Sequence, residues 1–302
     1  MHPSRLPLRR RVALALVPLG AALMWGGSGL ALPAHAAEGA DLRATFQAMR
    51  SRLASTPLQR PMVLESTDTA TGLKGDVFAV VNHPLQTIDN ALAQPAQWCE
   101  ALLLHLNNRA CTVSNGVDGG KQITLSVVRK YDQPVDSAFV LPFSFRVVDA
   151  SRDHLEFALG AASGPLGTSN YRIALEAIAL DPQHSFLHFS YAYDEGFLAH
   201  TATQAYLATF GRNKVGFTIV GHKPDGKPDY IRGTRGLVER NAMRYFLAVD
   251  SYLGTAADPS SRWNAWFTAT EKYPEQLHEV GRATYLELKK EDAGSRGSLP
   301  RG

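Results

Sequence analysis

The stretch Thr234–Leu253, with the sequence TRGLVERNAMRYFLAVDSYL, predicts the strongest helix of the chain. Its apolar positions recur at spacings of four and three residues and therefore share one face: they are Val238, Ala242, Tyr245, Val249 and Tyr252. Thr234 is of a type that caps helix N-termini, while Arg235 and Glu239 stand one turn apart on the opposite side. An amphipathic helix of this kind is a natural cover for the apolar face of a sheet.

The sheet is expected upstream, where apolar residues alternate with polar ones between positions 110 and 194. Ile123, Leu125 and Val127 share one face of a strand, and the same alternation runs from Phe139 to Val147. Two long strands follow over residues 169–180 and 186–194, with only four residues between them. Connections this short between alternating runs predict an antiparallel meander.

Further elements precede the sheet and follow the long helix in the sequence. Gly75–Asn82 is a predicted strand, and Pro95 separates two short helices, of which the second is apolar on nearly all sides and should be buried. An N-terminal helix is predicted over residues 37–57 from its apolar stripe of Leu42, Phe46, Met49 and Leu53. A last helical segment runs from Trp263 to about Lys290. We expect a single domain over residues 37–291, with helical extensions at both ends, and a loose tail over 292–302.

The order of these elements, from Gly75 to Leu253, resembles the helix-grip fold of the START-like superfamily. That superfamily includes steroid-transfer domains, plant allergens and polyketide cyclases. The resemblance implies an α+β fold in which a curved antiparallel sheet grips a long C-terminal helix around a hydrophobic cavity. Two features depart from it, since residues 196–233 intervene between the last strand and the long helix, and an extra helical segment carries Trp263 and Trp266.

Both cysteines lie in the segment Gln97–Cys111. A continuous helix would hold Cys99 and Cys111 about 18 Å apart, whereas a disulfide requires Cα atoms within roughly 7 Å. A bridge therefore demands that the chain reverse at Asn107-Asn108, so that Cys111 returns on a strand beside the helix. In an exported protein this pair predicts a disulfide.

Residues 1–36 are typical of an export signal. Four arginines precede an apolar run from Val12 to Leu32, and the small residues Ala34 and Ala36 suit cleavage before Ala37. Removing the signal leaves 27 basic and 28 acidic residues, so the basic balance of the full chain belongs to the signal. The sequence predicts a periplasmic or secreted protein without a nucleic-acid partner and without a stable membrane span after cleavage.

Candidate ligand-binding residues are polar or aromatic side chains on the elements expected to enclose the cavity. They are His105, Asn107, Arg172, Glu176, His188, Tyr191, Asn241 and Tyr245. Ordinary roles compete for each of them: His105 would suit a core histidine, and Arg172 and Glu176 would suit an exposed sheet face. Tyr191 is expected against Tyr245 of the long helix, and His188 lies on the same strand as Tyr191.

The chain lacks the motifs of several catalytic classes. His188, Ser190 and Asp194 share a strand face, but alternate residues of one strand do not form a hydrolase triad by themselves, and no G-x-S-x-G elbow is present. Cys99, His105 and Cys111 do not have zinc-site spacing. We therefore assign no catalytic residue, metal or cofactor from the sequence.

The leading hypothesis is an exported, soluble protein that binds a hydrophobic or amphipathic small molecule, such as a lipid or sterol, without catalysis. One alternative is an enzyme that acts on a hydrophobic substrate in the same cavity, in the manner of cyclases or hydrolases. Another is a cell-envelope protein without a cavity that binds a partner through its surface. The sequence leaves the ligand and the oligomeric state open.

Overall fold

The computed structural model describes residues 34–209, 211–255 and 258–297. The predicted export signal lies outside these residues except for positions 34–36, which begin helix α1 (Ala34–Ala54). Within the described part of the chain, no helix is both long and apolar enough to span a bilayer. The extent of the predicted domain and the site of cleavage stay predictions.

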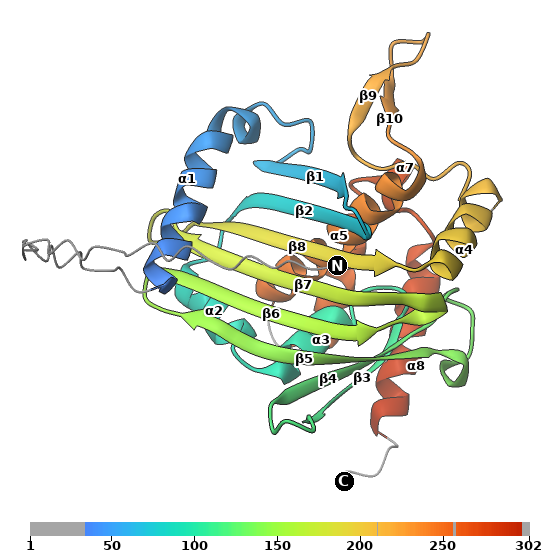
Figure 1. Ribbon diagram of the computed structural model, residues 1–302, viewed down its shortest axis with the longest axis horizontal. Coiled ribbons are helices and arrows are strands. Elements are labelled where there is room, and N and C mark those ends of the chain that lie inside the picture. Colours follow the sequence, from blue (N-terminus) through green and yellow to red (C-terminus); the bar gives the residue numbers. More distant parts are fainter. Residues whose placement is uncertain (1–33, 210, 256–257, 298–302) are drawn as a thin grey trace, which may run out of the picture. The chain divides into compact units, whose positions relative to one another are not determined.

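Eight antiparallel strands form the main sheet (Figure 1). In spatial order they are β1 (Met62–Asp68), β2 (Gly72–Val81), β8 (Ser185–Glu195), β7 (Thr168–Ala179), β6 (His154–Ser163), β5 (Phe139–Ala150), β4 (Lys121–Val127) and β3 (Asn108–Asn115). From β3 to β8 each strand pairs with the next in sequence, which confirms the predicted meander. β1 and β3 are the two edge strands.

The inner face of the sheet packs against α5 (Gly233–Leu253), as predicted. α5 starts one residue earlier than expected, and Arg232 rather than Thr234 occupies its N-cap. The helix comes nearest to the sheet at Gly75 of β2, where a Cβ atom would lie 2.9 Å from the Cβ of Ala242. Glycine is therefore required there for the close approach of helix and strand.

The outer face is covered in part by α1, which lies across one end of β2, β8 and β7 in Figure 1. All four residues of its predicted apolar stripe contact one small cluster, which includes Phe78, Phe186 and Ile178 of the sheet. The sheet is thus covered on both faces at this end, by α5 on one side and by α1 on the other.

Helices α2 (Leu85–Leu92) and α3 (Pro95–Leu102) continue the inner layer, and Pro95 begins α3 as predicted. The predicted disulfide is present: Cys99 and Cys111 are bonded, with Cα atoms 5.5 Å apart. The chain reverses between them, because the side chain of Asn108 donates to the carbonyl oxygen of Leu102 at 2.8 Å.

The intervening segment 196–233 forms α4 (Phe197–Ala208) and a hairpin of β9 (Ile219–His222) and β10 (Pro228–Tyr230). The strand predicted over 214–220 is shorter and lies further along the chain than expected. After α5 the chain forms α6 (Pro259–Thr270), α7 (Pro274–Leu277) and α8 (Arg282–Gly297), where one helical segment is predicted.

Residues 292–297, predicted as a tail, are the end of α8. The carboxylate of Asp292 is buried and accepts from Nε of Arg109 on β3 at 2.6 Å. A buried charge is stable only with such a partner. This pair therefore fixes the end of α8 to the edge of the sheet.

Candidate functional site

Side chains fill the space between the sheet and α5, where the sequence predicts a ligand cavity. Trp98, Phe157, Phe189 and Phe246 are all fully buried in this cluster. The residues that would line a cavity contact one another instead, as is usual in a close-packed core. The pocket described below lies at an edge of the sheet, not between sheet and helix.

Three predicted ligand-binding residues meet in this inner layer. The ring of Tyr245 stacks on His105 at 4.8 Å and on Tyr191 at 5.4 Å between centroids. Burial raises the pKa of Tyr191 well above its usual value of 10 and that of Tyr245 to about 12. Both hydroxyls are therefore protonated near neutral pH and can act as hydrogen-bond groups but not as bases.

His105 is neutral in this environment. Burial, followed by the charges of Arg244 and Lys289, lowers its pKa well below 6.5. The backbone N–H of Asn107 donates to Nδ1 of the ring at 3.1 Å, so the neutral ring carries its proton on Nε2. No described residue accepts a hydrogen bond from this buried Nε2.

Two predicted asparagines have other positions. The side-chain amide of Asn107 donates to the carbonyl oxygens of Val128 and Arg129, at 2.9 and 3.2 Å. It therefore holds the turn after α3 against the end of β4. Asn241 is half-buried on α5.

The remaining predicted residues lie on the outer face of the sheet, so they share no site with the tyrosines. His188 contacts two carboxylates: Nε2 is 2.7 Å from Asp76 and Nδ1 is 3.4 Å from Glu176. Its ring also stacks on Phe78 at 4.3 Å. Burial lowers the pKa of His188, but the hydrogen bonds to both carboxylates outweigh burial, and the net shift is upward.

Arg172 lies further along the same outer face. It pairs with Asp194 of β8 at 3.3 Å, and almost half of its side chain is exposed. The structure thus separates Arg172 from Glu176, which pairs with His188 instead. An exposed ion pair of this kind contributes little to stability.

Two arginines of α5 form ion pairs with a carboxylate beyond α7. Arg240 and Arg244 are buried, and both donate to Oε1 of Glu279, at 2.5 and 2.6 Å. Burial would raise the pKa of Glu279, but the nearby cations outweigh it and hold that pKa below its usual range. This cluster joins α5 to the segment between α7 and α8.

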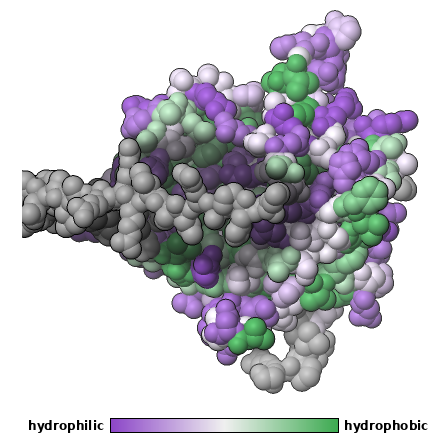
Figure 2. All heavy atoms as spheres, in the orientation of Figure 1, coloured by the Kyte–Doolittle hydropathy of each residue, from purple (hydrophilic) through white to green (hydrophobic). Residues whose placement is uncertain are grey.

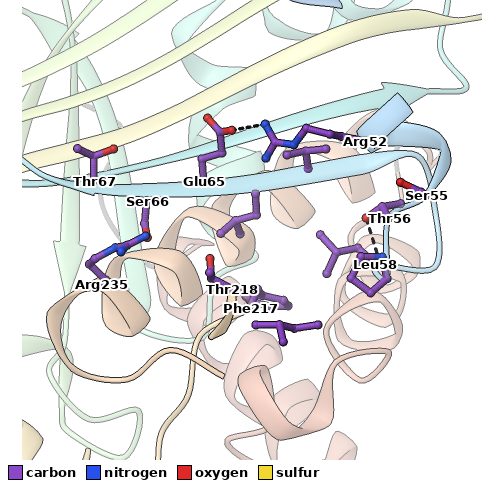
Figure 3. Close-up of a pocket in the computed structure, with 14 residues that line it drawn as sticks. Arg52, Ser55, Thr56, Leu58, Glu65, Ser66, Thr67, Phe217, Thr218 and Arg235 are labelled. Carbon is purple, nitrogen blue, oxygen red and sulfur yellow. Dashed lines mark hydrogen bonds and ion pairs between the residues drawn. The ribbon is translucent and has the colours of Figure 1, made fainter. Parts of the chain in front are cut away.

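A pocket of about 580 Å³ opens at the free edge of β1 (Figure 3). Its lining comes from the end of α1 and the loop after it (Arg52, Ser55, Thr56, Pro57, Leu58), from β1 (Val63, Leu64, Glu65, Ser66, Thr67), from the segment before β9 and its first residue (Phe217, Thr218, Ile219), and from Arg235 of α5. Sequence reasoning missed this site. No predicted ligand-binding residue lines it.

One end of the pocket is polar. Nε of Arg235 donates to the hydroxyl of Ser66 at 3.0 Å, and that hydroxyl donates to the fully buried Glu239 at 2.6 Å. Glu239 also accepts from the backbone N–H groups of Phe217 and Thr218, at 2.6 and 2.9 Å. The carboxylate thereby anchors the wall of the pocket to α5, and Figure 3 shows Arg235 beside Ser66 in the pocket lining.

Two glycines allow this wall to lie so near to α5. A Cβ atom on Gly216 would be 2.9 Å from the Cα of Gly236, and one on Gly236 would be 3.2 Å from the backbone nitrogen of Gly216. Side chains at either position would push the segment away from Glu239. Both glycines are therefore required for the pocket as it stands.

The edge strand adds backbone groups to the polar lining. The carbonyl of Pro61 accepts from Val80 of β2 at 2.9 Å, so alternate residues from Pro61 onward direct their backbone groups to β2. Leu64 and Ser66 belong to the other set, whose N–H and C=O groups point to the free edge. An edge strand offers such groups to a bound molecule.

The opposite end of the pocket has apolar side chains beside the polar Ser55 and Thr56 (Figure 3). In Figure 3 Leu58 lies away from Arg235 and Ser66, with Phe217 between them. Pro57, Val63 and Ile219 add further apolar surface. The arrangement suits a molecule with a polar head and an apolar body.

No protein-family model matches the chain, and no curated protein sequence does. Among solved structures, norcoclaurine synthase from Thalictrum flavum is 14% identical, with 48% of this chain and 77% of that one aligned and a TM-score of 0.32. A START superfamily protein from Mycobacterium smegmatis is 12% identical over 49% of this chain and 91% of that one, with a TM-score of 0.30.

Human StAR-related lipid transfer protein 5 is similar at 9% identity, over 57% of this chain and 90% of that one, with a TM-score of 0.31. Likenesses at this level carry no functional conclusion. The fold follows from the topology itself, an antiparallel meander that packs one face against a long C-terminal helix. The chain therefore has the arrangement of sheet and long helix that its sequence predicts.

Proposed function

We propose that this protein is an exported binding protein for an amphipathic small molecule with an anionic head, held in the pocket beside β1. The observation that carries the proposal is the pocket of about 580 Å³ with Arg235 and hydroxyl groups at one end and apolar side chains at the other. Ligand pockets in proteins commonly have volumes of roughly 300–1,000 Å³ and a few convergent polar groups.

The charge of the head group follows from Arg235. Its Nε is bonded to Ser66, which leaves the two terminal nitrogens of the guanidinium as donors. No carboxylate among the described residues lies within ion-pair distance of it. A guanidinium binds a carboxylate or phosphate through paired hydrogen bonds.

Binding without catalysis fits the lining better than an enzyme does. The lining residues include neither His nor Cys, and Glu239, next to the pocket, already accepts four hydrogen bonds from Ser66, Phe217 and Thr218. Glu65 pairs with Arg52 at 2.5 Å. A general base needs a free lone pair and a pKa near the working pH, and neither carboxylate is placed for that role.

The head-group assignment is tested with a fatty acid and the fatty alcohol of the same length, each displacing a fluorescent fatty acid from the purified protein. The wild type should bind the acid about tenfold more tightly, because a hydrogen bond to a charged group contributes about 1.5–3 kcal/mol. Arg235→Gln should abolish this preference. Arg50→Gln, an exposed change on α1 outside the pocket, is the matched control and should keep it.

The location of the site is tested by filling the pocket. Thr67 and Thr112 are exposed threonines on the two opposite edge strands, and only Thr67 lines the pocket. Thr67→Trp should prevent binding, whereas Thr112→Trp should leave it unchanged. Equal affinities in both variants would place the ligand elsewhere and overturn the proposal.

Export is part of the proposal. It is supported by the signal-like residues 1–36 and by the disulfide, a bond that persists in oxidising compartments. Cell fractionation with N-terminal sequencing is the direct test: the mature chain should begin at Ala37 and be found in the periplasm or medium. An intact N-terminus on cytosolic protein would contradict it.

A further inference from the structure

The segment 196–233, here called the insertion, contains most of the exposed large apolar side chains that are not valine. Phe197 is 87% exposed, Leu198 69%, Val220 60% and Ile219 39%. Elsewhere in the described residues such exposed side chains are single valines and Leu166. Scattered valines need no explanation, whereas a concentration of larger apolar groups marks an interaction surface.

Helix α4 presents the first part of this surface. Its sequence, FLAHTATQAYLA, contains no Asp, Glu, Lys or Arg, and Ala199 is its buried residue. Leu166 adjoins it, because a Cβ atom on the neighbouring Gly167 would lie 3.8 Å from the Cβ of Leu198. Figure 1 shows α4 beside the end at which β8 finishes and the β9–β10 hairpin projecting past β1, and Figure 2 shows hydrophobic groups on each of them, with hydrophilic groups between.

The insertion is also basic. It contains five basic and two acidic residues, a net charge of +3, whereas the rest of the chain after position 36 has 22 basic and 26 acidic residues. Arg212, Lys227 and Arg232 are exposed. Exposed apolar groups flanked by cations are complementary to the surface of an anionic bilayer, which attracts the cations and accepts the apolar groups below its head groups.

The same insertion forms one wall of the pocket. Phe217, Thr218 and Ile219 line it, and Ile219 is itself partly exposed on the outside. A bilayer in contact with Ile219 and Val220 of the hairpin would therefore lie beside the pocket. The apolar surface, the positive charge and the pocket wall belong to one continuous stretch of chain.

We infer that the insertion is a membrane-docking surface through which the protein contacts an anionic lipid bilayer, with Phe197 and Leu198 as the inserted groups. The inference extends the proposed function, because it gives the route by which an amphipathic ligand enters and leaves the pocket. Docking itself requires only the exposed surface, so the two are separable by experiment.

The test uses sedimentation of the mature protein with vesicles of phosphatidylcholine alone and of phosphatidylcholine with phosphatidylglycerol. The wild type should bind the anionic vesicles and release them in high salt. Phe197→Ser with Leu198→Ser should weaken this binding by more than about tenfold. Val117→Ser with Val140→Ser, two exposed valines outside the insertion, is the control and should bind as the wild type does.

The contribution of charge is tested separately. Arg212→Gln with Lys227→Gln removes two exposed cations and should weaken binding about thirtyfold, since each basic residue near an anionic surface contributes about 1 kcal/mol. Arg43→Gln with Arg50→Gln removes two exposed cations of α1 and should have no effect. Equal losses in the two double variants would indicate attraction by net charge and overturn the assignment of a specific surface.

Ligand binding in solution distinguishes this inference from the proposed function. The Phe197 and Leu198 variant should still displace the fluorescent fatty acid with wild-type affinity while it fails to bind vesicles. Failure of the wild type to bind anionic vesicles would overturn the docking inference and leave the pocket untouched. Binding of the protein to an envelope protein, but not to vesicles, would also overturn the docking inference. Vesicle binding without any ligand binding would remove the proposed function alone.

Discussion

The inner face of the eight-stranded sheet is packed with aromatic and aliphatic side chains against α5, whereas the outer face is covered by α1 over part of its area and elsewhere has ion pairs. Two histidines show the difference. His105 of the inner layer has a lowered pKa, and His188 of the outer face has a raised one. The histidine of the inner layer is neutral, whereas the histidine of the outer face is held in its charged form by two carboxylates.

The pocket lies where these two faces meet. β1 is an edge strand, so side chains from both of its faces border the same opening. Leu64 and Ser66 come from the inner face, while Val63, Glu65 and Thr67 come from the outer face. The mixed lining therefore results from the position of the pocket at the end of the sheet.

The largest effect expected from this comparison is on two adjacent residues of β5. Leu141 is buried on the inner face, and Val140 is 64% exposed on the outer face. Leu141→Ala should lower the free energy of unfolding by about 2–5 kcal/mol, and Val140→Ala should change it by less than about 0.5 kcal/mol. Urea denaturation measures both. Similar costs at the two positions would show that the faces are not so different.

The disulfide gives a second test of the inner layer, because it joins α3 to β3 there. Replacing Cys99 and Cys111 together by alanine should cost about 3 kcal/mol, the contribution of closing a short loop in the unfolded chain. The oxidised protein should show no free thiol before reduction. Two thiols in the exported, unreduced protein would contradict the bond.

His105 tests whether the inner layer keeps a buried histidine neutral. Its pKa is lowered in the folded state by burial and by Arg244 and Lys289, so below pH 6.5 the unfolded chain takes up a proton that the folded chain does not. The free energy of unfolding should therefore fall with acid, by up to about 1.4 kcal/mol per pH unit from this group.

The matched variant is His105→Phe, which keeps a ring beside Tyr245 and cannot be protonated. Its unfolding free energy should fall less steeply than that of the wild type between pH 6.5 and 5. The slope is the readout, since the substitution itself changes packing at every pH. Parallel curves would show that His105 is protonated in the folded protein.

Local pattern made most of the fold predictable from the sequence. The stripes of α1 and α5 and the alternation of β4 and β5 are properties of neighbouring residues, and even the reversal at Asn107-Asn108 follows from the reach of a disulfide. The faces of β8 were harder to read. Both of its sides are largely buried, under α5 and under α1, so alternation places His188 and Tyr191 on opposite faces but does not reveal which face lies against α5.

The pocket was not predictable in the same way. It brings residues 52–67 together with residues 217–235, and only long-range packing sets that contact. The available signal was the insertion, which departs from the resembled fold and includes Gly216, whose partner Gly236 lies on α5. A glycine pair indicates a close approach only after its partner segment is known. The buried pair of Arg109 and Asp292 escaped prediction for the same reason.

The smallest effect, and the one that tests the outer face most directly, concerns His188. Its raised pKa means that its contribution to stability is full below about pH 6.5 and is lost as pH rises through the folded value. The lowered pKa values of Asp76 and Glu176 mean that theirs is present above about pH 4.5 and is lost as pH falls through their folded values. The cluster should stabilise the fold most between these limits.

His188→Gln should therefore cost about 1–2 kcal/mol near pH 6, where the charged hydrogen bonds are intact, and less at pH 8.5. His184→Gln is the control: His184 also pairs with an aspartate, Asp181, but both side chains are roughly half exposed, and its loss should cost less than about 0.5 kcal/mol. The difference between the two variants should narrow as the pH rises. A difference that widened with pH would mean that His188 is bound as a neutral ring, as His105 of the inner layer is.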